Sequence, residues 1–165
     1  MKTSRSPAGF AAFYEETKDA VLRAVVLARA GETEGAEDAV AEAYERALLR
    51  WDELAEHPNP AGWVVRTAIN HRISMWRRHA RKSPAARETT SLASEALDPA
   101  LLRAVRRLPR GQREVLALRL LLDFSTEQTA AALGVRQGTV KAQLHRALRT
   151  LRLELATHEP EEVWQ

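Results

Sequence analysis

The segment 137–155 combines two side-chain patterns that suit contact with a nucleic acid. Apolar side chains recur there at helical spacing and define one face that a helix would bury. The opposite face is basic and polar, and no acidic residue appears before Glu154. Because DNA repels carboxylates and rewards arginine and lysine, this face predicts DNA binding; the alternative is a solvated face on a packed helix. The apolar stripe is Val140, Leu144, Leu148, Leu151 and Leu155, and the polar face is Gln137, Thr139, Lys141, Gln143, His145, Arg146 and Arg149.

The residues just before this segment predict that it is the second helix of a helix-turn-helix. Ser125 and Gln128 have the spacing of a capping box, in which each side chain bonds a backbone N–H at the start of a helix. Ala130 is small where two helices would cross closely. Gly134 stands where the first helix must end in a left-handed residue.

A second candidate for nucleic-acid contact is the segment 59–82. Asn59 followed by Pro60 is a strong signal for a helix start. Two stripes then run in parallel, one apolar and one rich in arginine and asparagine, which predicts a helix that packs on one side and touches phosphates and bases on the other. The apolar stripe is Val65, Ile69, Ile73 and Trp76; the polar stripe is Arg66, Asn70, Ser74, Arg77 and Arg81, widened by Arg78 and Lys82.

The segment 31–60 has the opposite charge. It holds nine acidic and two basic residues, a balance of −7, whereas 61–87 holds seven basic residues and no acidic one. A helix is expected from about Thr33, with Asp38, Glu42 and Glu45 outside its apolar stripe. Blocks this polarised indicate different partners for different faces. The apolar stripe is Ala36, Val40, Ala43, Ala47 and Trp51.

The remaining segments complete an all-helical chain. A first helix is expected over 7–30 and ends at Gly31, and Asp98-Pro99 repeats the cap-plus-proline start. Two short helices follow, one ending at Pro109 and one over 111–121. Residues 83–97 are rich in Ser, Thr and Ala and predict a linker between two small helical domains, and the tail 157–165 is acidic.

Composition excludes several classes of function. The chain has no cysteine, which rules out disulfides, thiolate metal sites and thiol catalysis. No apolar run approaches the roughly 20 residues of a membrane helix, and the N-terminus lacks a signal peptide, so a cytoplasmic protein is expected. His71 and His79 are eight apart, which does not suit a metal pair. Neither a catalytic site nor a cofactor is expected.

Taken together, these segments resemble bacterial sigma factors of the extracytoplasmic-function group, over about residues 10–155. The sequence AEDAVAEAYERALLRWDEL at 36–54 looks like their core-binding helix, and NPAGWVVRTAINHRISMWRRHARK at 59–82 looks like the helix that melts and reads the −10 element. The segment from Leu102 to Arg152 is similar to their region 4. The implied domains are 7–82 (region 2) and 98–156 (region 4), joined by the linker 83–97.

The resemblance implies a sigma factor that binds core RNA polymerase and directs it to promoters, with catalysis left to the polymerase. The acidic helix would dock on the clamp helices of the largest subunit, region 4 would meet the flap of the second-largest subunit, and an anti-sigma protein is a further possible partner. Docking would involve Asp38, Glu42 and Glu45; the −10 contacts Arg66, Asn70, Arg77, Arg78 and Arg81; the −35 contacts Gln137, Thr139, Lys141, Ala142, Gln143, His145, Arg146 and Arg149. Trp51 and Trp63 are expected in the core.

Four residues depart from the family pattern. Ala142 and Gln143 stand where serine and arginine are usual, Thr129 replaces an isoleucine-like residue, and Ser74 replaces an aspartate. The alternative function is a response-regulator-type helix-turn-helix regulator that is not a polymerase subunit. An enzyme is the third alternative. It is disfavoured because the sequence shows neither a nucleophile paired with a base nor a Gly-rich phosphate loop.

Overall fold

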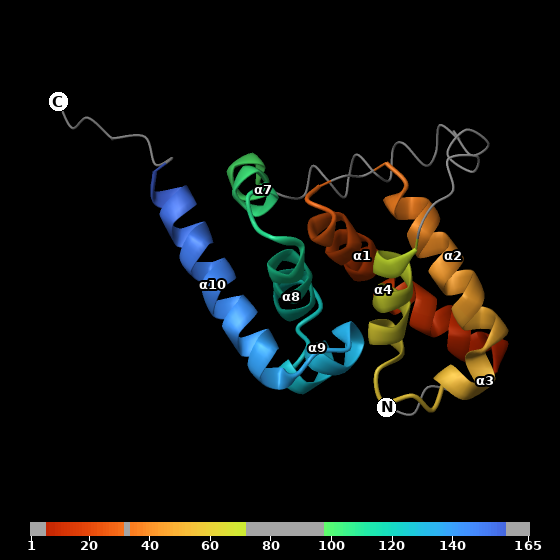
Figure 1. Cartoon of the computed structure of the whole chain (residues 1–165). Coiled ribbons are helices and arrows are strands. Elements are labelled where there is room, and N and C mark those ends of the chain that lie inside the picture. Colours follow the sequence, from red (N-terminus) through yellow and green to blue (C-terminus); the bar gives the residue numbers. More distant parts are fainter. Residues whose placement is uncertain (1–5, 32–33, 72–97, 158–165) are drawn as a thin grey trace.

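The computed structural model describes residues 6–31, 34–71 and 98–157. All the regular structure in these residues is α-helical (Figure 1). The N-terminal half contains α1 (Pro7–Ala28), α2 (Ala36–Leu49), α3 (Trp51–Leu54) and α4 (Pro60–Asn70), and the C-terminal half contains α7 (Pro99–Arg106), α8 (Arg110–Leu120), α9 (Thr126–Leu133) and α10 (Gln137–Ala156). None of these helices is long and apolar enough to cross a membrane.

Local sequence signals set where several helices begin. The Asn59 side-chain oxygen accepts from the Gly62 backbone N–H at 2.9 Å, and the Asp98 carboxylate accepts from the Ala100 N–H at 2.6 Å. In both helices a proline follows the cap, where its missing N–H costs no hydrogen bond. Both predicted helix starts are therefore confirmed.

An aromatic cluster forms the centre of the N-terminal half. Phe13 stacks on Trp51 with ring centroids 5.0 Å apart, and Phe10 meets the edge of the same indole at 5.3 Å. Trp51 is 4% exposed, which confirms its predicted place in the core. Tyr44 is buried beside Phe13, and its hydroxyl lies 2.8 Å from that of Thr17. Burial raises the pKa of Tyr44 to about 12.

The helix-turn-helix forms as predicted. Both hydrogen bonds of the capping box are present: the Gln128 N–H donates to Ser125 Oγ at 3.0 Å, and the Ser125 N–H donates to Gln128 Oε1 at 2.9 Å. Gly134 ends α9 with φ of 67°. Thr129 is fully buried, and its hydroxyl donates to the Ser125 carbonyl at 2.8 Å, so the departure from an apolar residue leaves no unsatisfied polar group.

Two expectations about the helices themselves were wrong. Leu155 lies on the predicted apolar stripe but is exposed, while Ala147, which was not part of that stripe, is fully buried near the middle of α10. The second concerns the helix expected over 59–82. It ends at Asn70, and His71 has an extended backbone (ψ of 118°) with its side chain turned to Glu42 on α2. The linker 83–97 and the tail from 158 lie outside the described residues.

The two halves pack directly against each other. α8 lies between α10 and α1, and α9 packs against α4 (Figure 1). Buried apolar residues of both halves form one continuous cluster, which joins Val25 and Val65 to Leu116 and Leu118. The acidic helix α2 and the basic helix α10 thus lie at opposite edges of the molecule.

Candidate nucleic-acid interface

The outer face of α10 carries the residues expected to read the −35 element. Six of the eight are exposed, whereas Ala142 and Gln143 are half-buried. Val140 and Ala147 point the other way and are fully buried, so the helix is anchored on one side and open on the other. The six exposed residues are Gln137, Thr139, Lys141, His145, Arg146 and Arg149.

Gln143 lies on the flank of α10 that faces α8. A Cβ atom placed on Gly111, in the first turn of α8, would lie 3.4 Å from Gln143 Nε2. The side-chain amide of Gln143 therefore lies against α8, at the edge of the polar face of α10. This contact could not be predicted from the sequence, because Gly111 and Gln143 are brought together only by the packing of α8 on α10.

The start of α9, the first helix of the helix-turn-helix, is fixed from two sides. The capping box satisfies the backbone at Ser125. The Arg119 guanidinium donates to the Phe124 carbonyl, so the end of α8 is tied to the residue before that cap. The first helix is thus held at its start, and α10 is held by its packing on α8 and α9, so the recognition helix can present its side chains to a groove with little loss of conformational freedom.

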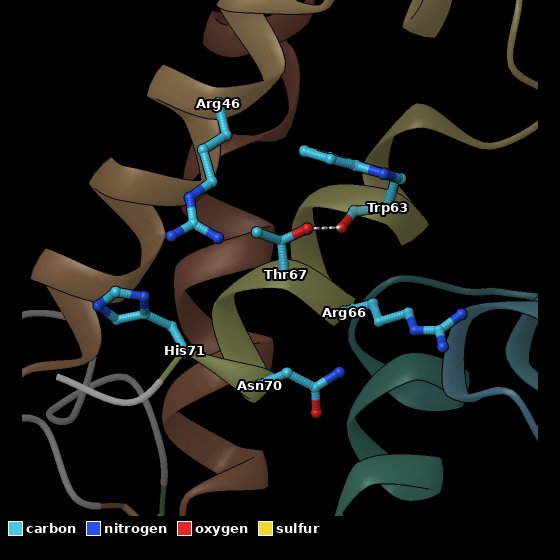
Figure 2. Close-up of a pocket in the computed structure, with 6 residues that line it drawn as sticks. All are labelled: Arg46, Trp63, Arg66, Thr67, Asn70 and His71. Atoms are coloured by element: carbon cyan, nitrogen blue, oxygen red, sulfur yellow. Dashed lines mark hydrogen bonds between the residues drawn. The ribbon is translucent and has the colours of Figure 1, made fainter.

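A pocket of about 450 Å³ opens beside α4. Figure 2 shows the side chains that line it. Thr67 Oγ donates to the Trp63 carbonyl at 2.8 Å. Arg66 and Asn70, both exposed, are the two predicted −10 residues that the structure describes; Arg77, Arg78 and Arg81 lie outside the described residues. The lining residues are Arg46, Trp63, Arg66, Thr67, Asn70 and His71.

Chemically, this pocket combines an aromatic surface with cationic and amide groups. Trp63 was expected in the core, but it is only half-buried, and the Arg50 guanidinium lies 5.8 Å from its ring centroid. Aromatic rings stack on unpaired bases and arginines hold phosphates, so the pocket suits single-stranded DNA. Arg46, Thr67 and His71 were not predicted as pocket residues, because only the packing of α2 on α4 brings them together.

Glu42 does not face outward as its sequence position predicts. Its carboxylate accepts from Arg46 at 2.6 Å and lies 3.1 Å from His71 Nε2, and its side chain is 16% exposed. Glu42 thus ties α2 to the end of α4, at the edge of the pocket.

The outer surface of α2 contains acidic and apolar groups together. Asp38 is half-buried and Glu45 is exposed. Leu48 and Leu49 are exposed at the end of the helix, Leu49 to 86%. The sequence signal for these leucines is their position off the stripe of Ala36, Val40, Ala43 and Ala47. Within the described ranges, no group of three acidic or histidine side chains is arranged to hold a metal ion.

Comparison with known proteins identifies both halves. Residues 13–82 match the family described as Sigma-70 region 2, and residues 99–151 match the family described as Sigma-70, region 4. The RNA polymerase sigma-E factor of Streptomyces antibioticus is 39% identical over 132 residues, which cover 75% of this chain and 72% of that protein. The ECF RNA polymerase sigma factor SigL of Mycobacterium tuberculosis is 33% identical over 156 residues, 87% of each chain.

The ECF RNA polymerase sigma factor BldN of Streptomyces coelicolor is 31% identical over 159 residues, which cover 86% of this chain and 58% of that protein. The two region matches occur in the order of the two helical halves; the first includes α4 with the exposed Arg66, and the second includes the exposed basic face of α10. The chain therefore belongs to the extracytoplasmic-function group of bacterial RNA polymerase sigma factors.

Proposed function

We propose that this sigma factor reads promoters with two separate helices, α10 at the −35 element and α4 at the −10 element, while α2 docks on core RNA polymerase. As a member of its family it binds core RNA polymerase and directs promoter-specific initiation. The observation that carries the division of labour is the distribution of charge. The basic face of α10 and the acidic face of α2 lie at opposite edges of the molecule.

The α10 face supports reading of duplex DNA. Lys141, His145, Arg146 and Arg149 are exposed along one helix whose other side is packed on α8, which is the arrangement of a recognition helix in a major groove. A good bidentate contact between a side chain and a base is worth about 1–3 kcal/mol of discrimination. The side chain of Gln143 lies against α8, so Gln143 and the small Ala142 would contact DNA at the edge of this surface. Gln137 and Thr139, in the first turn, would complete it.

The pocket beside α4 supports reading of an unpaired base. Trp63 offers a surface for stacking, and Asn70 can pair with a base edge through its amide. Arg66 would hold the backbone, and Arg77, Arg78 and Arg81 would continue this contact beyond the described residues. Promoter opening would then proceed by capture of a base after it leaves the duplex.

Docking on polymerase would use the outer surface of α2. Asp38 and Glu45 offer carboxylates to a basic partner, and Leu48 and Leu49 offer apolar area beside them. The proposed partner sites are the clamp helices of the largest subunit for α2 and the flap of the second-largest subunit for region 4. A role of Glu42 in docking stays a prediction. An anti-sigma protein is a proposed further partner, and the cytoplasm, where polymerase works, is the proposed location.

The test is transcription in vitro with core polymerase, this protein and a genomic promoter library. Promoter-specific runoff that depends on the protein is expected, and the protein is expected to have no catalytic activity of its own. DNA binding by the protein alone, with no effect on core polymerase, would support a regulator of the response-regulator type instead.

Two substitutions separate the roles. Asp38→Arg is expected to weaken binding to core polymerase while −35 duplex binding stays intact, because it reverses the charge at the docking surface. Arg146→Ala is expected to weaken −35 binding by roughly tenfold, the equivalent of about 1.4 kcal/mol, with core binding unchanged. Matched controls are Asp19→Arg on α1 and Arg152→Ala on α10, both exposed. Equal loss of both activities in either variant would contradict the division of labour.

A further inference from the structure

One basic residue interrupts the acidic and apolar surface of α2. Arg46 is the single arginine or lysine within that helix, and it lines the pocket beside α4. Arg50, which caps the end of α2 four residues later, places its guanidinium 5.8 Å from the ring centroid of Trp63 on α4. The side chains of Arg46 and Arg50 are 54% and 57% exposed. The edge of α2 that faces α4 is therefore cationic, whereas its outer surface is not.

The Arg46 side chain is held from behind. Its Nη2 donates to Glu42 Oε1 at 2.6 Å, and Glu42 Oε2 lies 3.1 Å from Nε2 of His71 at the end of α4. The carboxylate is only 16% exposed, so it lies between the two helices while the guanidinium reaches into the open pocket. Within the described residues Glu42 is the only partner of Arg46, which leaves other N–H donors of the guanidinium available to a ligand.

The pocket has a cation on each side of α4. Figure 2 shows Arg46 on the side next to α2 and Arg66 directed away from it, on the opposite side of α4. The six lining residues that the structure describes include these two guanidiniums and no carboxylate. Single-stranded DNA is bound where cations follow the backbone and an aromatic ring lies between them, and Trp63 supplies such a ring. Arg66 accounts for one side of this arrangement, and the side of Arg46 has no role in reading bases.

We propose that Arg46 binds a phosphate of the unpaired −10 strand, so that α2 contacts polymerase with its outer surface and DNA with its inner edge. The proposal rests on the assignment of α4 to the −10 element and adds a contact from the helix assigned to docking. A guanidinium suits this ligand because it directs several N–H donors at the anionic oxygens. Glu42 acts as a positioning residue, because it keeps one guanidinium nitrogen and leaves the others to the phosphate. His71 steadies Glu42 from α4.

The first experiment measures how binding depends on salt. Core polymerase saturated with the full chain is titrated onto a single-stranded −10 oligonucleotide from a promoter found by runoff selection. Arg46→Gln is expected to bind about tenfold more weakly, as for loss of one hydrogen bond to a charged group. The slope of log affinity against log salt should become shallower by about 0.7, the value for one phosphate on a single strand.

Lys18→Gln on α1 is the matched control. It also removes one positive charge from region 2 and breaks an ion pair of the same length, 2.6 Å to Glu15, away from the pocket. Its affinity and salt slope should match those of the wild type. Arg46→Lys should keep the wild-type slope, because it keeps the charge. The same shallow slope in Arg46→Lys as in Arg46→Gln would mean that Arg46 acts through its packing, and this would overturn the proposal.

The second experiment identifies the phosphate. A series of −10 oligonucleotides carries one methylphosphonate each, which removes the charge of one phosphate at a time. One position should weaken the wild type while costing Arg46→Gln nothing further, as expected when both changes remove the same contact. Arg46→Gln should keep the base preference of the wild type, because a phosphate contact carries no sequence information. Asn70→Ala should change that preference.

These outcomes separate the phosphate contact from the base contacts. Arg46→Gln that matches Lys18→Gln overturns the proposal, and so does a loss of core affinity as large as the loss of strand affinity. A wild type insensitive to every methylphosphonate also overturns it, and this measurement requires no variant to fold. If Arg46→Gln behaves as expected but Asn70→Ala changes nothing, the phosphate contact stands and the base-reading role of α4 fails. The reverse result leaves the −10 assignment of α4 intact and removes Arg46 from it.

Discussion

At the scale of single residues, Glu42 makes one contact that its sequence position predicts and one that it does not. Its pairing with Arg46 four residues later is visible in the sequence, because residues at this spacing share a helix face. Its contact with His71, 29 positions away, is not visible there. That contact makes Glu42 a link between α2 and α4, and its expected role in docking stays a prediction.

Glu42→Gln is therefore expected to impair promoter melting more than polymerase affinity. The change removes the carboxylate charge beside Arg46 and His71, and loss of the acceptor of a charged group such as the Arg46 guanidinium costs about 1–3 kcal/mol. Glu45→Gln, on the exposed surface of the same helix, should do the reverse. The measurements are permanganate footprinting of melted DNA and binding to core polymerase. A larger loss of core affinity in Glu42→Gln than in Glu45→Gln would contradict the prediction.

Tyr44 is expected to make the fold sensitive to alkali. Burial raises the pKa of Tyr44 in the folded state from 10.0 to about 12, so the unfolded chain ionises first as pH rises. Its stabilising contribution is full below pH 10 and is lost as pH rises toward about 12. At about 1.4 kcal/mol for each pKa unit, the loss approaches roughly 3 kcal/mol.

The measurement is urea unfolding between pH 8 and pH 12. Tyr44→Phe should flatten the alkaline fall, at the expense of the hydroxyl contact with Thr17. Tyr14→Phe is the control, since that ring is partly exposed. An unchanged alkaline fall in Tyr44→Phe would show that other groups dominate.

At the scale of elements, the helix starts could be predicted and some of the ends could not. Caps at Asn59, Asp98 and Ser125 act within three residues, so their sequence signals are complete. The end of α4 at Asn70 depends on where His71 meets α2, which is a tertiary contact. The same limit explains Leu155, since periodicity continues along α10 beyond the core that could cover it.

Gly134→Ala is expected to destabilise the protein by about 1–2 kcal/mol, because φ of 67° strains any residue with a Cβ. The guanidinium of Arg66 beside that position adds a close contact. Gly138→Ala is the matched control: it lies within α10, and its Cβ would meet nothing within 4 Å. That variant should be stabilised by up to about 1 kcal/mol. Thermal unfolding and −35 duplex binding measure both variants, and equal effects would contradict the strain argument.

At the scale of the whole molecule, the two halves could be predicted, but their contact could not. The blocks of like charge and the helix-cap residues in the sequence predict two helical domains, region 2 and region 4. The surfaces between them use small and aliphatic residues such as Ala24, Val25 and Ala117, which read as ordinary core residues of their own helices. The helical spacing of apolar residues predicts which face of a helix is buried, but not which other helix will pack against it.

One cooperative unfolding transition is expected for the free chain, because buried residues of both domains form one cluster. The variant Arg106→Gln/Arg113→Gln removes two hydrogen bonds between the domains but leaves the shared cluster intact, so it should lower the transition temperature and keep a single transition. Scanning calorimetry is the measurement, with Arg103→Gln/Arg110→Gln as the control. Two transitions in the wild type would mean that the shared cluster does not couple the domains.

Two arginines of region 4, Arg106 and Arg113, donate hydrogen bonds to carbonyls at the end of α1. These contacts impose an order on how the protein forms during synthesis. Arg113 lies 85 residues after Ala28, the carbonyl it binds. At about 5–20 residues per second, the ribosome needs roughly 4–17 s to add that stretch. Over this interval the first helix has been synthesised while the carbonyl of Ala28 still depends on water. The N-terminal domain of the nascent chain is thus completed only when the last third of the message has begun to be translated.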